Sequence, residues 1–513
     1  MPEAGRDRAR YRFGPLERRG LIAGWRGGQI AAVAAGLVLG VLTLRARPSV
    51  SGVLVALGLA AAALAFACWP VAGRTGEQWC PLVCRWLLAT VSGGRLQSAP
   101  GPGRGLIADV DERGPDGVTI RPAPRSVGRG RGGPTRGAFD GVRVVTCPLT
   151  DEPDAPGAGV ILDERARTAA AVLAVRGHSF ALLAPSDQDA RVSAWARVLA
   201  ALAREGSAVH RIQWVESCLP DDGDAARRHL RERAVLGPET APGRSYAGLV
   251  DQCAPVTRRH RTLVSVTVHT GRSARAIRAS GGGTAGAGAV LLREAGALQR
   301  LLEEADATVD GILGPGALTA VLREAAAPAA AAGSAAGSPG PPTSWPWPMA
   351  VEPAWDAVRT DGTWHATYWI AEWPRVDVTP DFLGPLLFSP LRRSIAVVME
   401  PVSPLRAARQ VAQARTADIA DGELRRRGGF LVTARQTREK EGVEHRDAEL
   451  ADGHAQYRFS GYVTVTADDA DALRGACASL EQAGGQARME LRRLYGEQDL
   501  AWACTLPLGR GLA

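Results

Sequence analysis

The sequence predicts an α+β protein in which an N-terminal transmembrane helical hairpin precedes two α/β modules, the second ferredoxin-like (split βαβ) with an inserted helical hairpin. Two apolar runs lie near the N-terminus, strand and helix patterns alternate from Val142 onward, and a low-complexity segment interrupts that alternation. The predicted organisation is a basic cytoplasmic N-terminus at 1–27, a two-helix transmembrane hairpin at 28–71, an interfacial amphipathic helix at 72–92, a tether rich in Gly, Pro and Arg at 93–138, a first α/β module at 139–325, a linker at 326–344 and a second α+β module at 345–513.

The hairpin is predicted from two apolar runs, Gln29 to Leu44 and Gly52 to Val71. The second run is ample for a hydrocarbon core of about 30 Å, while the first is at the short end of the required length. Arg45, Arg47 and Pro48 between them favour a turn over one continuous helix. A cleaved signal peptide is the alternative, but a second and longer apolar run follows directly, which is not typical of one.

The orientation of the hairpin follows from its arginines. Two arginines lie between the apolar runs. Nine flank the runs on their outer sides: Arg6, Arg8, Arg10, Arg12, Arg18, Arg19 and Arg26 before the first, and Arg74 and Arg85 after the second. Because arginine is enriched in loops on the cytoplasmic side, both ends of the chain are expected there, with the protein in the cell membrane.

Two sets of residues are candidates for contacts at the membrane. Gly36 and Gly40 form a GxxxG pair, which lets helix backbones approach closely in lipid, although a glycine-rich coding bias explains the pair equally well. Trp79, Arg85 and Trp86 lie in the amphipathic segment and are predicted to anchor it at the bilayer interface.

The sequence contains no recognised catalytic set. Its single lysine, Lys440, lies between two glutamates, so the lysine of a P-loop is absent. Two GxGxxG matches, at 128–133 and 281–286, lack the strand and tight turn that a dinucleotide site requires. The eight histidines and eight cysteines show no metal-ligand spacing. We therefore expect no enzymatic activity, no cofactor and no metal.

Hydrophobic periodicity assigns the elements of the soluble part. In the first module, strands are predicted at 142–149, 159–163, 169–175, 180–184, 207–216 and 262–270, and helices near 186–202, 221–236, 245–254, 287–305 and 318–325. In the second, strands are predicted at 364–373, 394–399, 456–466 and 488–495, with a helix at 468–483 and a charged helical hairpin at 405–449. We place that hairpin in the first crossover of the split βαβ unit.

Four segments carry a resemblance to a known family: Arg211 to Asp222, Ser394 to Gln410, Arg426 to Arg435 and Thr505 to Arg510. Together they resemble an actinobacterial family of two-span membrane proteins associated with conjugation or type IV secretion. The resemblance implies that the hairpin is similar to PrgI, the small membrane subunit of conjugative machines. It also implies that the soluble part is similar to the N-terminal, non-ATPase part of the conjugation ATPase.

The function expected from this resemblance is a non-enzymatic scaffold in the inner membrane that docks a separately encoded P-loop ATPase and assembles as a homo-oligomer within a larger complex. One alternative is a type VII secretion component resembling EccE, which also places a soluble domain after two N-terminal spans. Another is a membrane-tethered DNA-binding protein that uses the Arg-rich tether or the helical hairpin. The partners expected are therefore membrane lipid and the ATPase, with DNA as the alternative.

Overall fold

The computed structural model describes residues 13, 26–71, 73–91, 97–98, 113–114, 117–118, 137–149, 157–177, 180–221, 223–237, 239–253, 257–328, 346–428 and 434–512. The predicted N-terminal segment, tether and linker lie largely outside these residues, and so does the GxGxxG match at 128–133. Within the tether the described strands are β1 (Gln97–Ser98), β2 (Arg113–Gly114) and β3 (Gly117–Val118).

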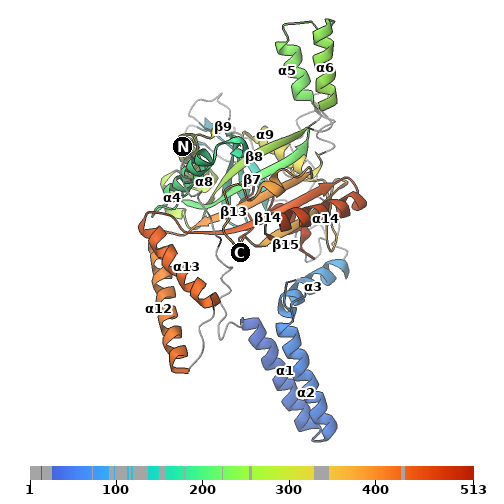
Figure 1. Cartoon of the computed structure of the whole chain (residues 1–513), viewed down its shortest axis with the longest axis vertical. Coiled ribbons are helices and arrows are strands. Elements are labelled where there is room, and N and C mark those ends of the chain that lie inside the picture. Colours follow the sequence, from blue (N-terminus) through green and yellow to red (C-terminus); the bar gives the residue numbers. More distant parts are fainter. Residues whose placement is uncertain are drawn as a thin grey trace, which may run out of the picture.

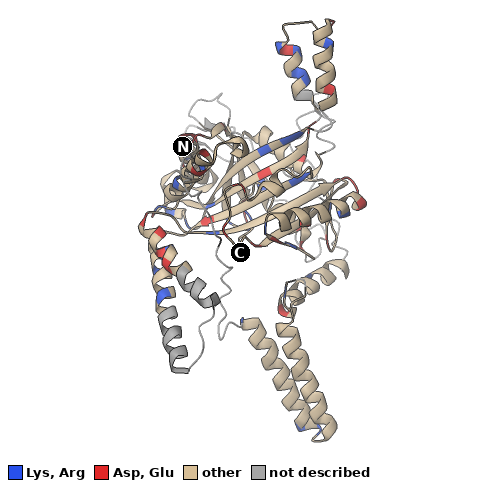
Figure 2. Cartoon of the chain, viewed as in Figure 1, with Lys and Arg blue, Asp and Glu red and all other residues tan. Residues whose placement is uncertain are grey.

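Two long apolar helices form the N-terminal hairpin, α1 (Gly27–Ala46) and α2 (Val50–Cys68). Both are long and apolar enough to cross a membrane, and Figure 2 shows almost no charged residues along them. The Ser49 hydroxyl accepts a hydrogen bond from the Gly52 N–H at 3.2 Å and caps α2. The predicted pair of apolar helices is confirmed.

Gly36 and Gly40 lie buried where α1 packs against α2. A Cβ atom added at Gly36 would come within 2.3 Å of the Ala63 Cβ, and one at Gly40 within 3.7 Å of the Ala56 Cβ. The structure therefore places the GxxxG pair inside the hairpin, where glycine permits the two backbones to approach.

The soluble part begins with a unit of six strands, which we call the N-terminal repeat. Its strands are β4 (Val142–Cys147), β5 (Ala158–Asp163), β6 (Thr168–Arg176), β7 (Val209–Pro220), β8 (Arg258–His269) and β9 (Thr308–Ile312). Its helices are η1 (Phe180–Leu182), α4 (Pro185–Leu202), α5 (Asp224–Arg233), α6 (Ala241–Cys253), α7 (Ala274–Ala279), α8 (Gly283–Glu304) and α9 (Pro315–Ala326). β5 is buried along its whole length because the sheet is covered on both faces.

A second unit of six strands follows, the C-terminal repeat. Its strands are β10 (Ala350–Pro353), β11 (Val358–Thr360), β12 (Thr363–Glu372), β13 (Arg393–Pro401), β14 (Tyr457–Ala467) and β15 (Glu490–Arg493). Its helices are α11 (Gly384–Leu387), α12 (Pro404–Gly428), α13 (Ala434–Ala451), α14 (Ala470–Gln486) and α15 (Gln498–Ala503). The Asp469 carboxylate caps α14 by accepting from two backbone N–H groups.

The two units have the same topology. In the first, the strand order is β7-β8-β6-β5-β4. β9 pairs with the same edge of β6 as β5 does, but with the second half of that strand. In the second, the order is β13-β14-β12-β11-β10, and β15 pairs with β12 in the same manner. Each unit thus contains a split βαβ arrangement, with strand orders β9-β6-β8-β7 and β15-β12-β14-β13. This internal repeat was not predicted from the sequence.

Backbone conformation supports the duplication. Among the described residues, four that are not glycine have positive φ angles. Arg167 (55°) and Asp361 (46°) lie in the turns that precede β6 and β12, and Asp306 (62°) and Arg488 (58°) precede β9 and β15. Since non-glycine residues rarely adopt positive φ, their occurrence at equivalent turns indicates that both units share one backbone plan.

The repeats meet where β7 pairs with β13, an antiparallel contact that we call the seam. Its register runs from Cys218 opposite Arg393 to Ile212 opposite Met399. The pairing joins both repeats, together with β1, which pairs with β10 at one edge, into one 13-stranded sheet. Strands assigned to two separate modules in the sequence analysis therefore lie in a continuous sheet, and the predicted fold class of an apolar hairpin followed by mixed α+β structure is confirmed.

The helical hairpin of the C-terminal repeat lies between the two strands where it was predicted, but the connection between them is not a crossover. α12 and α13 connect β13 to its antiparallel neighbour β14, whereas the prediction assigned this connection to the first crossover of the split βαβ unit. The first crossover is the segment containing α11, between β12 and β13. In the N-terminal repeat, α5 and α6 are inserted at the equivalent point between β7 and β8. Because β7 and β13 are antiparallel, the two hairpins project from opposite ends of the sheet (Figure 1).

Helices cover both faces of the sheet. On one face α4 and α8 pack on the N-terminal repeat around Leu202 and Leu298, while α14 packs on the C-terminal repeat around Leu480. On the other face a single hydrophobic cluster extends across both repeats and includes Leu318 of α9 and Trp502 of α15. The repeats therefore share a core as well as a sheet.

Candidate functional site: the seam and the membrane joint

The membrane joint is the contact between α3 (Gly76–Val91) and the C-terminal repeat. Trp79 stacks on Trp355, with ring centroids 5.9 Å apart, and Trp86 meets the same ring edge-on at 5.5 Å. The Arg85 guanidinium donates to the Gly496 carbonyl at 3.1 Å. All three residues predicted as interfacial anchors therefore contact the soluble domain.

One glycine allows the polypeptide segments to approach closely at this joint. Gly73 has a φ of 73°, and its carbonyl accepts a hydrogen bond from Arg492 at 2.9 Å. A Cβ atom at Gly73 would lie 2.3 Å from that guanidinium. Arg74, the next residue, forms an ion pair with Glu497. The joint thus combines charge pairing with aromatic stacking, which fixes α3 against the sheet.

On the face of the sheet that carries α11, a buried ion pair crosses the seam. Arg393 of β13 is fully buried and pairs with Glu216 of β7. Arg393 also donates to the Leu387 carbonyl, and the second Glu216 oxygen lies 2.7 Å from His260 Nδ1. A buried charge without a partner is strongly unfavourable, so each repeat satisfies a charge of the other.

Cys218, His260 and Glu216 are arranged in the order of a nucleophile, a base and an orienting carboxylate. The Cys218 sulfur lies 4.0 Å from His260 Nε2. However, Cys218 is fully buried, and burial raises its pKa, which leaves the thiol protonated. An activated cysteine requires the opposite shift and access to substrate. We therefore assign this cluster a structural role, and the absence of enzymatic activity stays a prediction.

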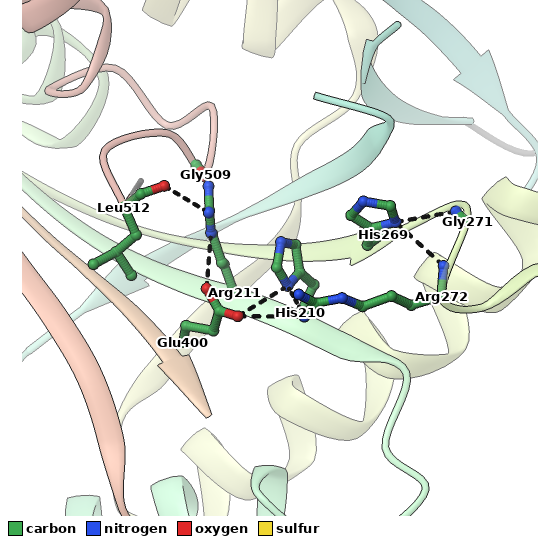
Figure 3. A network of polar contacts seen from close by, with 8 residues as sticks. All are labelled: His210, Arg211, His269, Gly271, Arg272, Glu400, Gly509 and Leu512. Carbon is green, nitrogen blue, oxygen red and sulfur yellow. Dashed lines mark hydrogen bonds and ion pairs between the residues drawn. The ribbon is translucent and has the colours of Figure 1, made fainter. Parts of the chain in front are cut away.

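On the other face of the seam, Glu400 of β13 lies close to basic side chains of the N-terminal repeat (Figure 3). Arg211 Nε lies 3.6 Å from one carboxylate oxygen, and Arg272 Nη1 lies 3.3 Å from the other. His210 Nδ1 is 3.8 Å from Glu400. The seam is thus crossed by an ion pair on each face of the sheet.

The C-terminal segment crosses this second face and binds both repeats. Arg211 donates to the carbonyls of Gly509 and Leu512, as Figure 3 shows. Gln213, which is fully buried, donates to the Leu506 carbonyl at 2.9 Å and accepts from the Gly509 N–H at 2.7 Å. Further contacts are made by Arg510 with Asp163 and by Tyr462 with the Gly511 carbonyl. The segment after α15 therefore ties the repeats together.

Burial and neighbouring arginines control the ionisation of this cluster. Burial, followed by the charge of Arg211, lowers the pKa of His210 to about 4. Burial also lowers the pKa of His269. Burial raises the pKa of Glu400, but its interaction with His210, the hydrogen bond from Arg272 and the charges of Arg211 and Arg272 outweigh that effect and lower the pKa. At neutral pH the cluster therefore contains two guanidinium groups, one carboxylate and neutral imidazoles.

Within the described ranges, no group of three or more His, Cys, Asp or Glu side chains is placed to hold a metal ion. The seam residues were not selected from the sequence as a site. The sequence did hold one signal for these residues: three of the four segments that carry the family resemblance lie at the seam. These three segments coincide with β7, with β13 and the start of α12, and with the C-terminal segment. The fourth includes the last residues of α12 and the first of α13, and its other residues lie outside the described ones.

In the comparison with protein families, residues 256–370 match the model of the EccE family, described as "Putative type VII ESX secretion system translocon, EccE". The search of curated proteins finds no match. Together with the two apolar helices, the match supports a membrane component of a secretion system.

The buried ion pair of the seam can be tested by a double-mutant cycle. We expect Arg393→Met and Glu216→Gln each to lower the free energy of unfolding by roughly 3–5 kcal/mol, because each leaves a buried charge without its partner. The double variant should lose less than the sum of the two. Urea unfolding of the detergent-solubilised chain, followed by tryptophan fluorescence, measures this.

The control for this cycle is Ser394→Ala, which removes only the hydroxyl contact of 3.1 Å with Ser217 across the same seam. It should cost about 1 kcal/mol or less. Strictly additive losses in the Arg393 and Glu216 variants would show that the two side chains do not interact.

The neutral His210 predicts a dependence of stability on pH. Its pKa of about 4 in the folded protein lies below its value of 6.5 in an unfolded chain. The unfolded state therefore binds the extra proton between these values, and stability should fall as pH falls from about 6.5 to about 4. His210→Gln should reduce that fall by roughly 1–3 kcal/mol. Thermal unfolding of both proteins across this range provides the measurement, and parallel curves would contradict the assignment.

Proposed function

We propose that this chain is a membrane component of a type VII secretion system, similar to EccE, in which α1 and α2 anchor a docking platform built on the 13-stranded sheet. The observation that carries the proposal is the EccE match at 256–370. That region extends from just before β8 to near the end of β12. It therefore includes parts of both repeats and their connection, rather than one isolated unit.

Several structural features suit a platform of this kind. The sheet is wide, it is joined to the membrane hairpin through α3, and its two helical hairpins project away from the body (Figure 1). In α5 and α6, Tyr246 and Leu249 are more than half exposed, although both are large and apolar. Exposed apolar side chains on a projecting element are typical of surfaces that contact partner proteins.

The sheet is assigned to the cytoplasm in this proposal. Arginines flank the apolar helices on the side of the soluble domain, and Arg45 and Arg47 lie at the opposite turn. The excess on the domain side favours a hairpin with both chain ends cytoplasmic. The platform would then meet cytoplasmic subunits, including a separately encoded P-loop ATPase, and would act without catalysis of its own.

The type IV interpretation has weaker support. The PrgI-like hairpin and the conjugation context were inferred from sequence resemblance, whereas the family match favours the type VII alternative. For DNA binding, the Arg-rich tether at 93–138 lies mostly outside the described residues. We therefore do not carry the DNA-binding hypothesis further.

Affinity purification from native membranes tests the proposal. The full chain, tagged at its C-terminus and extracted in mild detergent, should co-purify with components of a type VII translocon. An equally tagged two-span membrane protein from the same cells serves as the control. Deletion of the gene should abolish secretion of small WxG-type substrates, and the full chain should restore it.

Two results would contradict the proposal. Co-purification of a conjugation-type coupling ATPase without type VII components would favour the type IV interpretation instead. Normal secretion of the WxG-type substrates in the deletion strain, with no translocon component co-purifying, would exclude a role in type VII secretion.

A further inference from the structure

The outer side of α3 is apolar and exposed. Cys80, Cys84, Leu87 and Val91 are all exposed, Leu87 to 55% and Val91 to 86%. Their spacing of four, three and four residues places them in one stripe along the helix. Trp79 and Trp86 lie on the opposite side, against Trp355. α3 is therefore a helix with two apolar sides, of which the inner one contacts the sheet.

The stripe begins at the membrane boundary. The end of α2 and the start of α3 are in contact, because a Cβ atom at Gly76 would lie 2.4 Å from the Phe66 ring. Arg26, which caps α1, lies 3.9 Å from Glu77 in the first turn of α3. Between the helices, Trp69 is 72% exposed. The stripe thus begins next to the exposed apolar surface of the hairpin, with the charged side chains of Arg26 and Glu77 at the junction.

We propose that the outer stripe of α3, formed by Cys80, Cys84, Leu87 and Val91, is inserted into the interfacial region of the same bilayer that α1 and α2 cross. Lipid is the occupant that continuity with the apolar hairpin favours. The residues predicted as interfacial anchors, Trp79, Arg85 and Trp86, contact the sheet domain, and their contact with lipid stays a prediction. α3 then couples the two environments, with lipid on one side and the C-terminal repeat on the other, and fixes the orientation of the sheet relative to the membrane.

This inference depends on membrane anchoring and not on the type of secretion system, so its failure leaves the proposed function untouched. Native cysteines allow a direct test. A variant with Cys68, Cys80 and Cys253 changed to Ser keeps Cys84 as its exposed thiol. A matched control with Cys68, Cys80 and Cys84 changed keeps Cys253, at the end of α6. Figure 1 shows α6 above the sheet and α3 below it.

Each full-length variant is labelled with bimane and reconstituted in nanodiscs. Dibrominated lipid should quench the label at Cys84 severalfold more than the label at Cys253, and aqueous iodide should quench in the reverse order. Equal iodide quenching at both positions would show that the stripe faces water. Protection of Cys84 from iodide without quenching by brominated lipid would show that protein, such as a second copy, covers the stripe. Either result overturns the inference.

A second pair of variants tests the stripe itself. Leu87→Asp should increase iodide quenching at Cys84 severalfold, because a carboxylate at this position is unfavourable in the bilayer interface. Leu405→Asp is the control, since Leu405 is 58% exposed on α12 and lies outside the stripe. If both substitutions leave the quenching unchanged, Leu87 does not contact lipid and the proposal fails.

Discussion

The pairing of β7 with β13 is the interaction on which the rest of the molecule depends. Without it, each repeat would have an unpaired strand edge and a charged side chain, Glu216 or Arg393, that lacks its partner of opposite charge. The Arg393 pair on one face, the Arg211 pair on the other and the C-terminal segment bound to Gln213 all require both strands in register. The cluster shared by α9 and α15 requires it as well.

The seam also determines where the projecting elements lie. Because it is antiparallel, the equivalent insertions α5–α6 and α12–α13 leave the sheet at opposite ends, and Figure 1 shows the membrane hairpin on the side of α12–α13. With the sheet held by α3, the α5–α6 hairpin lies at the end remote from α1 and α2. A platform anchored in this way can present one set of surfaces near the membrane and another far from it, as a component of a membrane complex needs.

The sequence predicted what depends on local pattern. Apolar length identified α1 and α2, and alternation such as Val264, Val266 and Val268 identified β8. Pairing partners were not predictable, because no local signal says that β13 meets β7, or that α12 and α13 join neighbouring strands. Trp79 and Arg85 were expected at the bilayer interface because the composition of the segment 72–92 suits one. Their contacts with Trp355 and Gly496 depend on the tertiary fold and were not predictable. Arg393 and Glu216 were not singled out from the sequence, because only the pairing of their strands brings them together.

Hydrogen exchange of the backbone amides in β7 and β13, measured by mass spectrometry on the full chain in nanodiscs, tests the seam most directly. If the two repeats form one sheet, these amides should exchange as slowly as those of the interior strands β8 and β14, and Arg393→Met should speed exchange in both seam strands together. Exchange in β7 and β13 as fast as in the edge strand β4, or a response to Arg393→Met confined to β13, would contradict a continuous sheet.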